Sequence, residues 1–340
     1  MSSPLPWWHA PGCHPVADGV HRIVLSMPND GLRAVNVYAI ELDGRDLALI
    51  DGGWAVPSAV DELTAGLAVI GRTPADVRDV YVTHIHRDHY TFAVRLRERY
   101  GARVHLGRAE APGLHGIQRL GSNVPTTSLH QLRRSGAAEL ADDVLHATRA
   151  EPFDPGDWAD PDHWVDAGPI RLGDRTLEAV PTPGHTKGHL VFHDVEHRLL
   201  FTGDHVLPTI TPSIGFELGD WDLPLGHYLR SLEALLERAD AVLVPAHGLP
   251  GGSVHQRVRD LLAHHEERLA GTRAAVAVAP GQPAAAVAAR LPWTRREVPL
   301  AELDRFNQMV AICETIAHLD VLVERGEVDA HPVAGIDLFC

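Results

Sequence analysis

The hydrophobic pattern of the first hundred residues alternates between strand-like and helix-like segments. Apolar and polar positions alternate over residues 19–27 and 32–42, with a Pro-Asn-Asp-Gly turn between them, and this predicts two half-buried strands. A short apolar run at residues 47–50 predicts a third strand, and residues 57–70 have the spacing of a helix that Gly71 would end. Strands that alternate with helices in this way indicate a sheet with helices packed on it.

The pattern changes further along the chain. Between about residues 109 and 164 it becomes irregular, with helix-like pieces and a proline-rich loop, and we interpret this stretch as a helical insert that Trp158 and Trp164 pack onto the body. Such an insert is either a lid or substrate wall, or a decoration of the surface. Regular signals then return, with strands predicted at 177–180, 190–192, 199–202 and 241–244 and a helix at 223–238.

The last part of the chain consists mainly of predicted helices. Residues 254–270, an alanine-rich segment and residues 300–325 predict three helices, and a short tail rich in β-branched residues follows. Helices followed by a small β wing are typical of a winged-helix-like accessory domain. The sequence therefore predicts an α/β protein with a main domain over residues 1–250, which carries the insert, and an accessory domain over residues 251–340.

Composition and charge narrow the class of protein. A hydrophobic fraction of 45% supports a substantial core, and a net charge of −15 argues against nucleic-acid partners, because phosphate contacts need a basic surface. Cys13, Cys313 and Cys340 have no Cys-x-x-Cys spacing, so we expect neither a disulfide framework nor a thiolate zinc site. The N-terminus lacks a signal-peptide pattern and no run suggests a membrane span, so we expect a soluble, cytoplasmic protein.

The candidate chemistry is concentrated in one segment, Thr83-His84-Ile85-His86-Arg87-Asp88-His89. It follows a predicted buried strand, Val80-Tyr81-Val82, and Asp88 opens a predicted helix that runs to Tyr100. Three imidazoles and a carboxylate therefore lie where a strand ends and a helix begins, and these groups suit Zn²⁺ and also Fe or Mn. We expect alternate residues of this turn to converge on one metal ion and the Asp-His pair to reach a second.

Three later motifs share one arrangement: an apolar strand, a sharp turn and a ligand-type side chain. His185 follows Pro181-Thr182-Pro183-Gly184, Asp204 follows Phe201-Thr202-Gly203, and His247 follows Val244-Pro245-Ala246. A single histidine after a strand is usually structural, but these motifs in one chain with the histidine-rich segment favour a shared metal centre.

Together these motifs resemble the metallo-β-lactamase superfamily, whose fold is an αββα sandwich with metals at the edge of two facing sheets. The resemblance covers about residues 20–248, and the motifs follow the family's order. It implies two metal ions per chain, with zinc expected, and makes Asp51 a support for the ligand loop. The implied ligands are His84, His86 and His185 for one metal, Asp88, His89 and His247 for the other, and Asp204 as the bridge.

The resemblance also indicates a branch of the family. A bridging aspartate is typical of glyoxalase II, lactonases and related acyl hydrolases rather than of lactam-hydrolysing members. Acyl-homoserine lactonases usually add a tyrosine shortly after this aspartate, whereas Val206-Leu207-Pro208 follows Asp204 here, which disfavours a lactonase. The C-terminal region is similar to the helical or winged appendage of glyoxalase II-like and endoribonuclease-like members.

Further residues are candidates for substrate or supporting contacts. His205 lies beside a ligand motif, and His265 falls where those relatives often carry a residue near the substrate entrance; each is more often a structural histidine. The family commonly has Gly-Gly shortly after the Asp-His pair. Tyr90-Thr91-Phe92 stands there in this chain, and we expect these larger side chains to reshape the pocket wall.

The predicted function is that of a dinuclear-metal hydrolase acting on a small acyl thioester or ester. Two metals bridged by Asp204 would lower the pKa of a bound water from about 15.7 to about 7, and the hydroxide would attack the acyl carbonyl. Asp88 and Asp204 are the carboxylates expected at the reacting centre. The chain has no G-x-S-x-G segment, and therefore no sign of a serine nucleophile on a strand-to-helix turn.

Three alternatives remain open from the sequence. A phosphodiesterase, an endoribonuclease or a lactonase would use the same metals, although an acidic chain lacks the basic surface that RNA binding needs. The C-terminal domain could bind DNA, for which Arg290, Arg295 and Arg296 form a sparse basic cluster, or act as a dimerisation arm in a homodimer. Electron transfer at a di-iron site would require a flavin domain, for which the sequence has no fingerprint.

Overall fold

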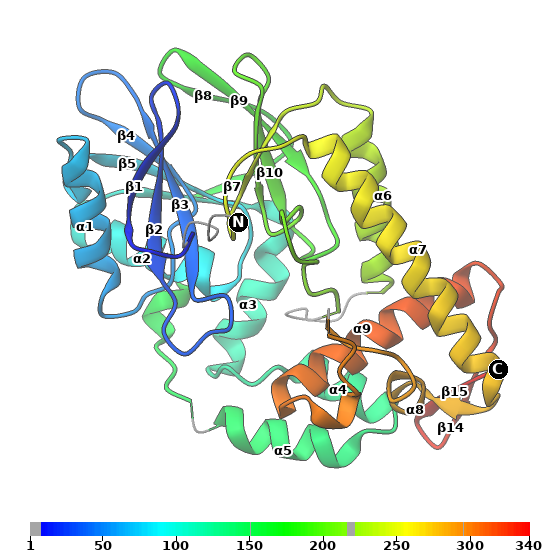
Figure 1. The fold of residues 1–340 in the computed structure, drawn as a ribbon. Helices are drawn as coiled ribbons and strands as arrows, with labels where there is room; N and C mark the ends of the chain where they lie inside the picture. The colour runs from blue at the N-terminus through cyan, green and yellow to red at the C-terminus, as the bar shows by residue number, and fades with distance from the viewer. Residues whose placement is uncertain (1–7, 150, 216–221, 295) are drawn as a thin grey trace, which may run out of the picture.

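Two β-sheets face each other and helices cover their outer faces (Figure 1), which is the expected αββα arrangement. The structure is a computed structural model that describes residues 8–149, 151–215, 222–294 and 296–340. Alternate residues of a strand point to opposite faces, so each strand contributes to two cores. In strand β3, Tyr38 and Ile40 enter the core between the sheets, whereas Val35 and Val37 pack outward.

The first sheet has seven strands in sequence order, with β1 to β4 paired antiparallel and β4 to β7 paired parallel. Helices α1 (Ala59–Val69) and α2 (Arg87–Tyr100) pack on its outer face. Its strands are β1 (Gly12–Ala17), β2 (Val20–Ser26), β3 (Ala34–Glu41), β4 (Leu47–Ile50), β5 (Val77–Val82), β6 (Arg103–Gly107) and β7 (His163–Val165).

The second sheet has five strands in the order β12-β11-β10-β9-β8, in which only β11 and β12 pair parallel. Helix α6 (Pro224–Leu236) and the start of α7 (Val254–Val278) pack on its outer face, where they meet Val191, Leu200 and Leu243. Its strands are β8 (Gly168–Leu172), β9 (Arg175–Pro181), β10 (Leu190–Asp194), β11 (Leu199–Gly203) and β12 (Val242–Pro245).

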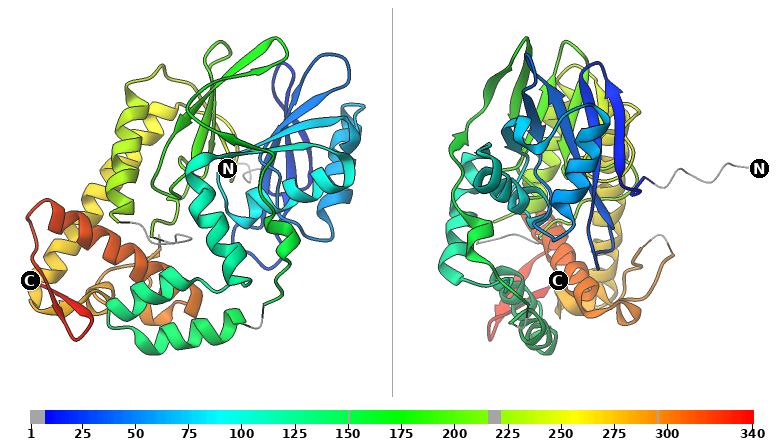
Figure 2. Two further views of the ribbon diagram at one scale, coloured as in Figure 1. Left: turned by 180° about the vertical axis from the view of Figure 1, so that it is seen from behind. Right: turned by 90° about the vertical axis from the view of Figure 1, so that its left-hand side faces the viewer.

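The insert and the C-terminal region pack against each other, as both views of Figure 2 show. Leu132 of α4 belongs to the same buried cluster as Ile316 of α9. At the end of α4, Arg134 lies 2.9 Å from Asp320 of α9 and also donates to Asp337 of β15. The insert is therefore part of a core and not a surface decoration. The elements concerned are α3 (Ala111–Leu120), α4 (Thr126–Arg134), α5 (Ala138–Arg149), α8 (Ala284–Ala288), α9 (Arg305–Glu324), β13 (Gln282–Pro283), β14 (Ala330–Val333) and β15 (Ile336–Phe339).

The C-terminal region consists of helices and a small sheet in the order β13-β15-β14, while the domain boundary near residue 250 stays a prediction. Of the sparse basic cluster, Arg290 donates to Gln282, and Arg295 lies outside the described residues. Cys13, Cys313 and Cys340 are free cysteines.

In the two facing sheets, three strands were not predicted, namely β1, β7 and β8, and each lies at the edge of its sheet. An edge strand pairs on one side only and tolerates proline, so its hydrophobic pattern is weak. Pro15 in β1 and Pro169 in β8 are examples.

One helix contradicts the expectation that no run suggests a membrane span. By length and composition alone α9 is apolar enough to cross a membrane, and it is the one such helix among the described residues. However, 61% of its most apolar window is buried inside the protein, because α9 packs against α4, α5 and α7. Its composition is therefore explained by its place in the core.

Candidate metal centre

Each predicted metal ligand follows the C-terminal end of a strand within a few residues along the chain. The histidine-rich segment follows β5, Asp204 follows β11 and His247 follows β12, while His185 lies four residues after the end of β9. These strand ends come from both sheets and meet at one edge of the sandwich, so the fold brings together side chains that are far apart in the sequence.

The seven side chains form three overlapping groups, within each of which the candidate ligand atoms lie no more than 4.8 Å apart. Asp204 lies between the two halves of the cluster. Its Oδ2 is 3.5 Å from Nε2 of His185, and its Oδ1 is 3.3 Å from Nε2 of His247. The groups are His84 with His86 and His185, His84 with His89 and Asp204, and Asp88 with His89 and His247.

The hydrogen bonds of the histidines leave their cluster-facing nitrogens available to a cation. Nδ1 of His185 donates to the Ser213 carbonyl at 2.9 Å, and Nδ1 of His247 donates to the Ala34 carbonyl at 2.8 Å. A carbonyl only accepts, so Nε2 of each ring carries a lone pair when the ring is neutral. Nε2 of His185 lies 3.0 Å from Nδ1 of His86, within hydrogen-bond distance inside the cluster. Nε2 of His247 is buried without a hydrogen-bond partner, which is rare for a buried polar atom. The same holds for Nε2 of His84 and His89 and for Oδ1 of Asp204. The nitrogen and oxygen atoms that these residues direct into the cluster are therefore suitable ligands for a metal ion.

Asp51 supports the cluster from outside. Its Oδ1 accepts hydrogen bonds from the backbone N–H and the hydroxyl of Thr83 at 2.7 and 2.9 Å, and its Oδ2 accepts from Nδ1 of His89 at 2.9 Å. The Thr83 hydroxyl in turn accepts from Nδ1 of His84 at 3.1 Å. One carboxylate thus orients two histidines, which agrees with the role expected for Asp51.

Burial and neighbouring charge divide the histidines into two sets. Burial lowers the pKa of His86 to about 3 and that of His185 to about 4, and it also holds the pKa of His84 well below the usual value. Burial lowers the pKa of His89 and His247 as well, but neighbouring carboxylates outweigh it and raise both values. A cation bound among these carboxylates would displace the protons of His89 and His247, because metal ligands must be deprotonated.

Two glycines permit close approaches around the cluster. Gly203 has a φ of +49°, and a Cβ there would lie 2.6 Å from Oγ1 of Thr83. A Cβ on Gly52 would lie 2.5 Å from the backbone nitrogen of Ala93 in α2. Residues with side chains at either position would push apart segments that carry ligands or their supports.

Tyr90 was expected to reshape the pocket wall, but it has a structural contact instead. It is fully buried, its ring stacks on Trp158 at a centroid distance of 6.4 Å, and its hydroxyl donates to the Ala159 carbonyl at 2.6 Å. Tyr90 therefore attaches α2 to the last part of the insert.

Two histidines that were candidates for substrate or supporting contacts also lie in the core. His205 is fully buried, with its ring centroid 4.9 Å from that of Tyr228. His265 is only 1% exposed, and its Nδ1 lies 3.2 Å from Nε2 of His318 in α9. The surroundings of His265 therefore favour a structural histidine over a place at a substrate entrance, because α9 covers this face of α7.

One buried acid beside the cluster was missed by the sequence analysis. Glu110, 1% exposed, ends the short 3₁₀ helix η2 (Arg108–Glu110) that follows β6. Its carboxylate accepts hydrogen bonds from the Thr186 hydroxyl and, at 3.4 Å, from the Ile85 N–H. No sequence pattern marks this glutamate, since its surroundings arise from segments distant in the chain.

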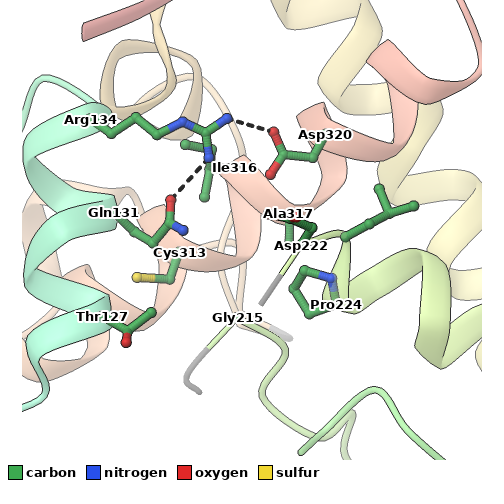
Figure 3. Close-up of a pocket in the computed structure, with 11 residues that line it drawn as sticks. Thr127, Gln131, Arg134, Gly215, Asp222, Pro224, Cys313, Ile316, Ala317 and Asp320 are labelled. Atoms are coloured by element: carbon green, nitrogen blue, oxygen red, sulfur yellow. Dashed lines mark hydrogen bonds and ion pairs between the residues drawn. The ribbon is translucent and has the colours of Figure 1, made fainter. Parts of the chain in front are cut away.

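A polar pocket of about 310 Å³ lies where the insert meets the C-terminal region (Figure 3). Arg134 crosses it with hydrogen bonds to Gln131 and Asp320. One wall includes Gly215, two residues from the Ser213 carbonyl that holds His185, so a short segment joins the pocket to the cluster. The described residues that line it are Thr127, Gln131, Arg134, Gly215, Asp222, Leu223, Pro224, Cys313, Ile316, Ala317 and Asp320.

Comparison with known proteins identifies the family. The sequence model of the metallo-beta-lactamase superfamily matches residues 30–247, a range that includes all seven cluster residues. The chain belongs to this superfamily. It also resembles two solved structures along nearly its whole length. A metallo-beta-lactamase family protein from Thermus thermophilus is 27% identical with a TM-score of 0.77, covering 95% of this chain and 98% of that one. A beta-lactamase domain protein from Burkholderia ambifaria is 25% identical with a TM-score of 0.75, covering 100% and 95%.

Curated members of the superfamily match over different lengths. Acyl-coenzyme A thioesterase MBLAC2 from Gallus gallus is 29% identical over 236 residues, which are 68% of this chain and 76% of that protein. A hydroxyacylglutathione hydrolase from Rhizobium johnstonii is 25% identical over 172 residues, 50% of each chain. The lactamase-like protein nscB from Neosartorya fischeri is 35% identical over 96 residues, which are 28% of this chain and 27% of that protein. The match to nscB thus spans about a quarter of that protein's length.

Proposed function

We propose that this superfamily hydrolase acts on an acyl thioester or ester with two divalent metal ions, zinc being the expected metal. The observation that carries the proposal is the cluster itself, in which buried Nε2 atoms without hydrogen-bond partners surround Asp204. The name of one relative, an acyl-coenzyme A thioesterase, supports a thioester, and that of another, a hydroxyacylglutathione hydrolase, supports an acyl substrate.

The chain's own residues have distinct roles in this proposal. The metal ions, when bound, supply an activated water and polarise the acyl carbonyl. Asp88 keeps the charge needed to hold a cation: burial raises its pKa, but His89 and His247 outweigh burial and hold that pKa well below its usual range. Hydrogen bonds at Nδ1 fix four of the histidines with Nε2 toward the cluster, namely His84, His89, His185 and His247. His86 instead faces His185 with Nδ1. The proposed ligand sets are His84, His86 and His185 for one ion and Asp88, His89 and His247 for the other, bridged by Asp204.

We further propose that the pocket of Figure 3 receives the part of the substrate beyond the acyl carbonyl. The pocket is polar, and its wall continues into the segment that holds His185. A bulky side chain at Thr127, as in Thr127→Trp, would fill it. This change should raise KM and leave kcat near the wild-type value, because it removes space for the substrate and touches no proposed ligand.

The proposal is tested by metal analysis of the purified protein, followed by a panel of acyl thioesters, esters and lactones after zinc is restored. We expect about two zinc ions per chain and faster hydrolysis of thioesters and esters than of lactones. Asp204→Ala should abolish hydrolysis, whereas Asp166→Asn, which changes an exposed acid paired with Arg108, should not. Full activity of Asp204→Ala would rule out the bridging role, and cleavage of RNA alone would favour a phosphodiesterase.

A further inference from the structure

Glu110 links two ligand-bearing loops to the start of the insert. From these contacts we infer that Glu110 is a positioning residue, which holds the His84–His86 turn against the His185 loop at the separation that one metal ion needs. The inference rests on the proposed function, and it assigns a role to a residue that lies outside all the ligand motifs.

The carboxylate of Glu110 accepts hydrogen bonds from both loops. Ile85, whose N–H donates at 3.4 Å, stands between His84 and His86. Thr186, whose hydroxyl donates to the same oxygen, directly follows His185, and the Gly188 N–H of the same loop donates as well. A shift of either loop would therefore break a hydrogen bond to a buried carboxylate, which is costly.

Backbone packing at this point leaves little room for adjustment. A Cβ on Gly188 would lie 2.3 Å from the backbone nitrogen of Glu110, and a Cβ on Gly107 would lie 2.3 Å from the Gly188 carbonyl oxygen. The His185 loop thus lies directly on the turn that ends β6 and begins the insert. Glu110 is the side chain through which this turn reaches both loops.

The separation that Glu110 maintains suits a metal ion. Nδ1 of His86 and Nε2 of His185 lie 3.0 Å apart. Two nitrogen ligands of a tetrahedral zinc, each at about 2.0–2.1 Å from the metal, would lie about 3.3 Å apart. Small movements of the two side chains therefore suffice for binding, and free movement of the loops would instead let the ligands separate.

The test compares zinc affinity, by competition with a chelator, and the visible absorption spectrum of the Co²⁺-substituted protein in Glu110→Ala, Glu110→Gln and a control. The control is Asp194→Asn, because Asp194 is also a fully buried carboxylate and accepts from Arg175 and His197 at the far end of β10. Asp194→Asn should lower the thermal stability and leave zinc affinity and the cobalt spectrum unchanged.

For Glu110→Ala we expect a loss of about 10–100-fold in zinc affinity, typical of the removal of a group that orients metal ligands, and a changed cobalt spectrum. Glu110→Gln keeps the acceptor for Thr186 and should recover part of the affinity. Wild-type zinc affinity and spectrum in Glu110→Ala would overturn the inference while leaving the proposed function intact. Failure of the wild-type protein to bind zinc would overturn both. If Glu110→Ala does not fold, Thr186→Val removes one of the hydrogen bonds, and unchanged affinity there would count against the inference.

Discussion

Replacing Asp51 with asparagine should weaken metal binding without unfolding the protein. Oδ1 of Asp51 accepts hydrogen bonds from the N–H and the hydroxyl of Thr83, and Oδ2 accepts one from Nδ1 of His89. The side-chain oxygen of an asparagine can still accept the hydrogen bonds from Thr83. Its NH₂ group would then face the N–H at Nδ1 of His89, and two donors cannot form a hydrogen bond. His89 would have to carry its proton on Nε2, which is the atom that faces the cluster.

The size of the effect follows from these contacts. Losing a partner that fixes the orientation of a metal-binding histidine costs about 10–100-fold in affinity, or about 1.4–2.7 kcal/mol. The hydrogen bonds to Thr83 can persist, so the loss in folding stability comes mainly from one charge-assisted hydrogen bond, about 1.5–3 kcal/mol. This is less than the stability of an ordinary domain, so Asp51→Asn should remain folded.

The assay is competition between the protein and a chelator for zinc, with circular dichroism to verify folding. Asp76→Asn is a matched control, because Asp76 likewise accepts from the N–H and hydroxyl of a threonine, Thr73, but lies at the exposed end of the sheet away from the cluster. Zinc affinity in Asp51→Asn equal to that of Asp76→Asn would refute the role given to Asp51.

Three further changes test other parts of the structure. Gly203→Ala should cost about 1–3 kcal/mol and reduce zinc content, because its Cβ would lie 2.6 Å from Thr83 Oγ1; metal analysis and urea denaturation measure both. Arg134→Met should lower the free energy of unfolding by about 1–3 kcal/mol, since it leaves Asp320 of α9 without its hydrogen-bonded ion-pair partner; unchanged urea denaturation would contradict this. Burial lowers the pKa of His318 to about 4, below its value near 6.5 in the unfolded chain, so its contribution to stability is present above pH 6.5 and is lost as the pH falls to 4, by up to about 3 kcal/mol. His318→Gln should show a shallower loss of stability between these pH values, and an equal slope would count against this explanation.

The fold and the set of cluster residues could be predicted because their signals are local. Each ligand-type side chain follows a strand and a turn, and strand ends gather at the edge of a sheet. Edge strands such as β7 were missed because they pair on one side only. The environments of His265 and Glu110 could not be predicted, since they depend on α9 and on the His185 loop, which are distant in the sequence.

The central claim is that side chains from both sheets bind a pair of metal ions. Anomalous diffraction at the zinc absorption edge, from crystals of the zinc-loaded protein, tests this most directly. We predict two peaks, one contacted by His86 and His185, the other by Asp88 and His247, with Asp204 between them. Peaks elsewhere, or side chains of His185, Asp204 and His247 turned away from the zinc, would contradict it.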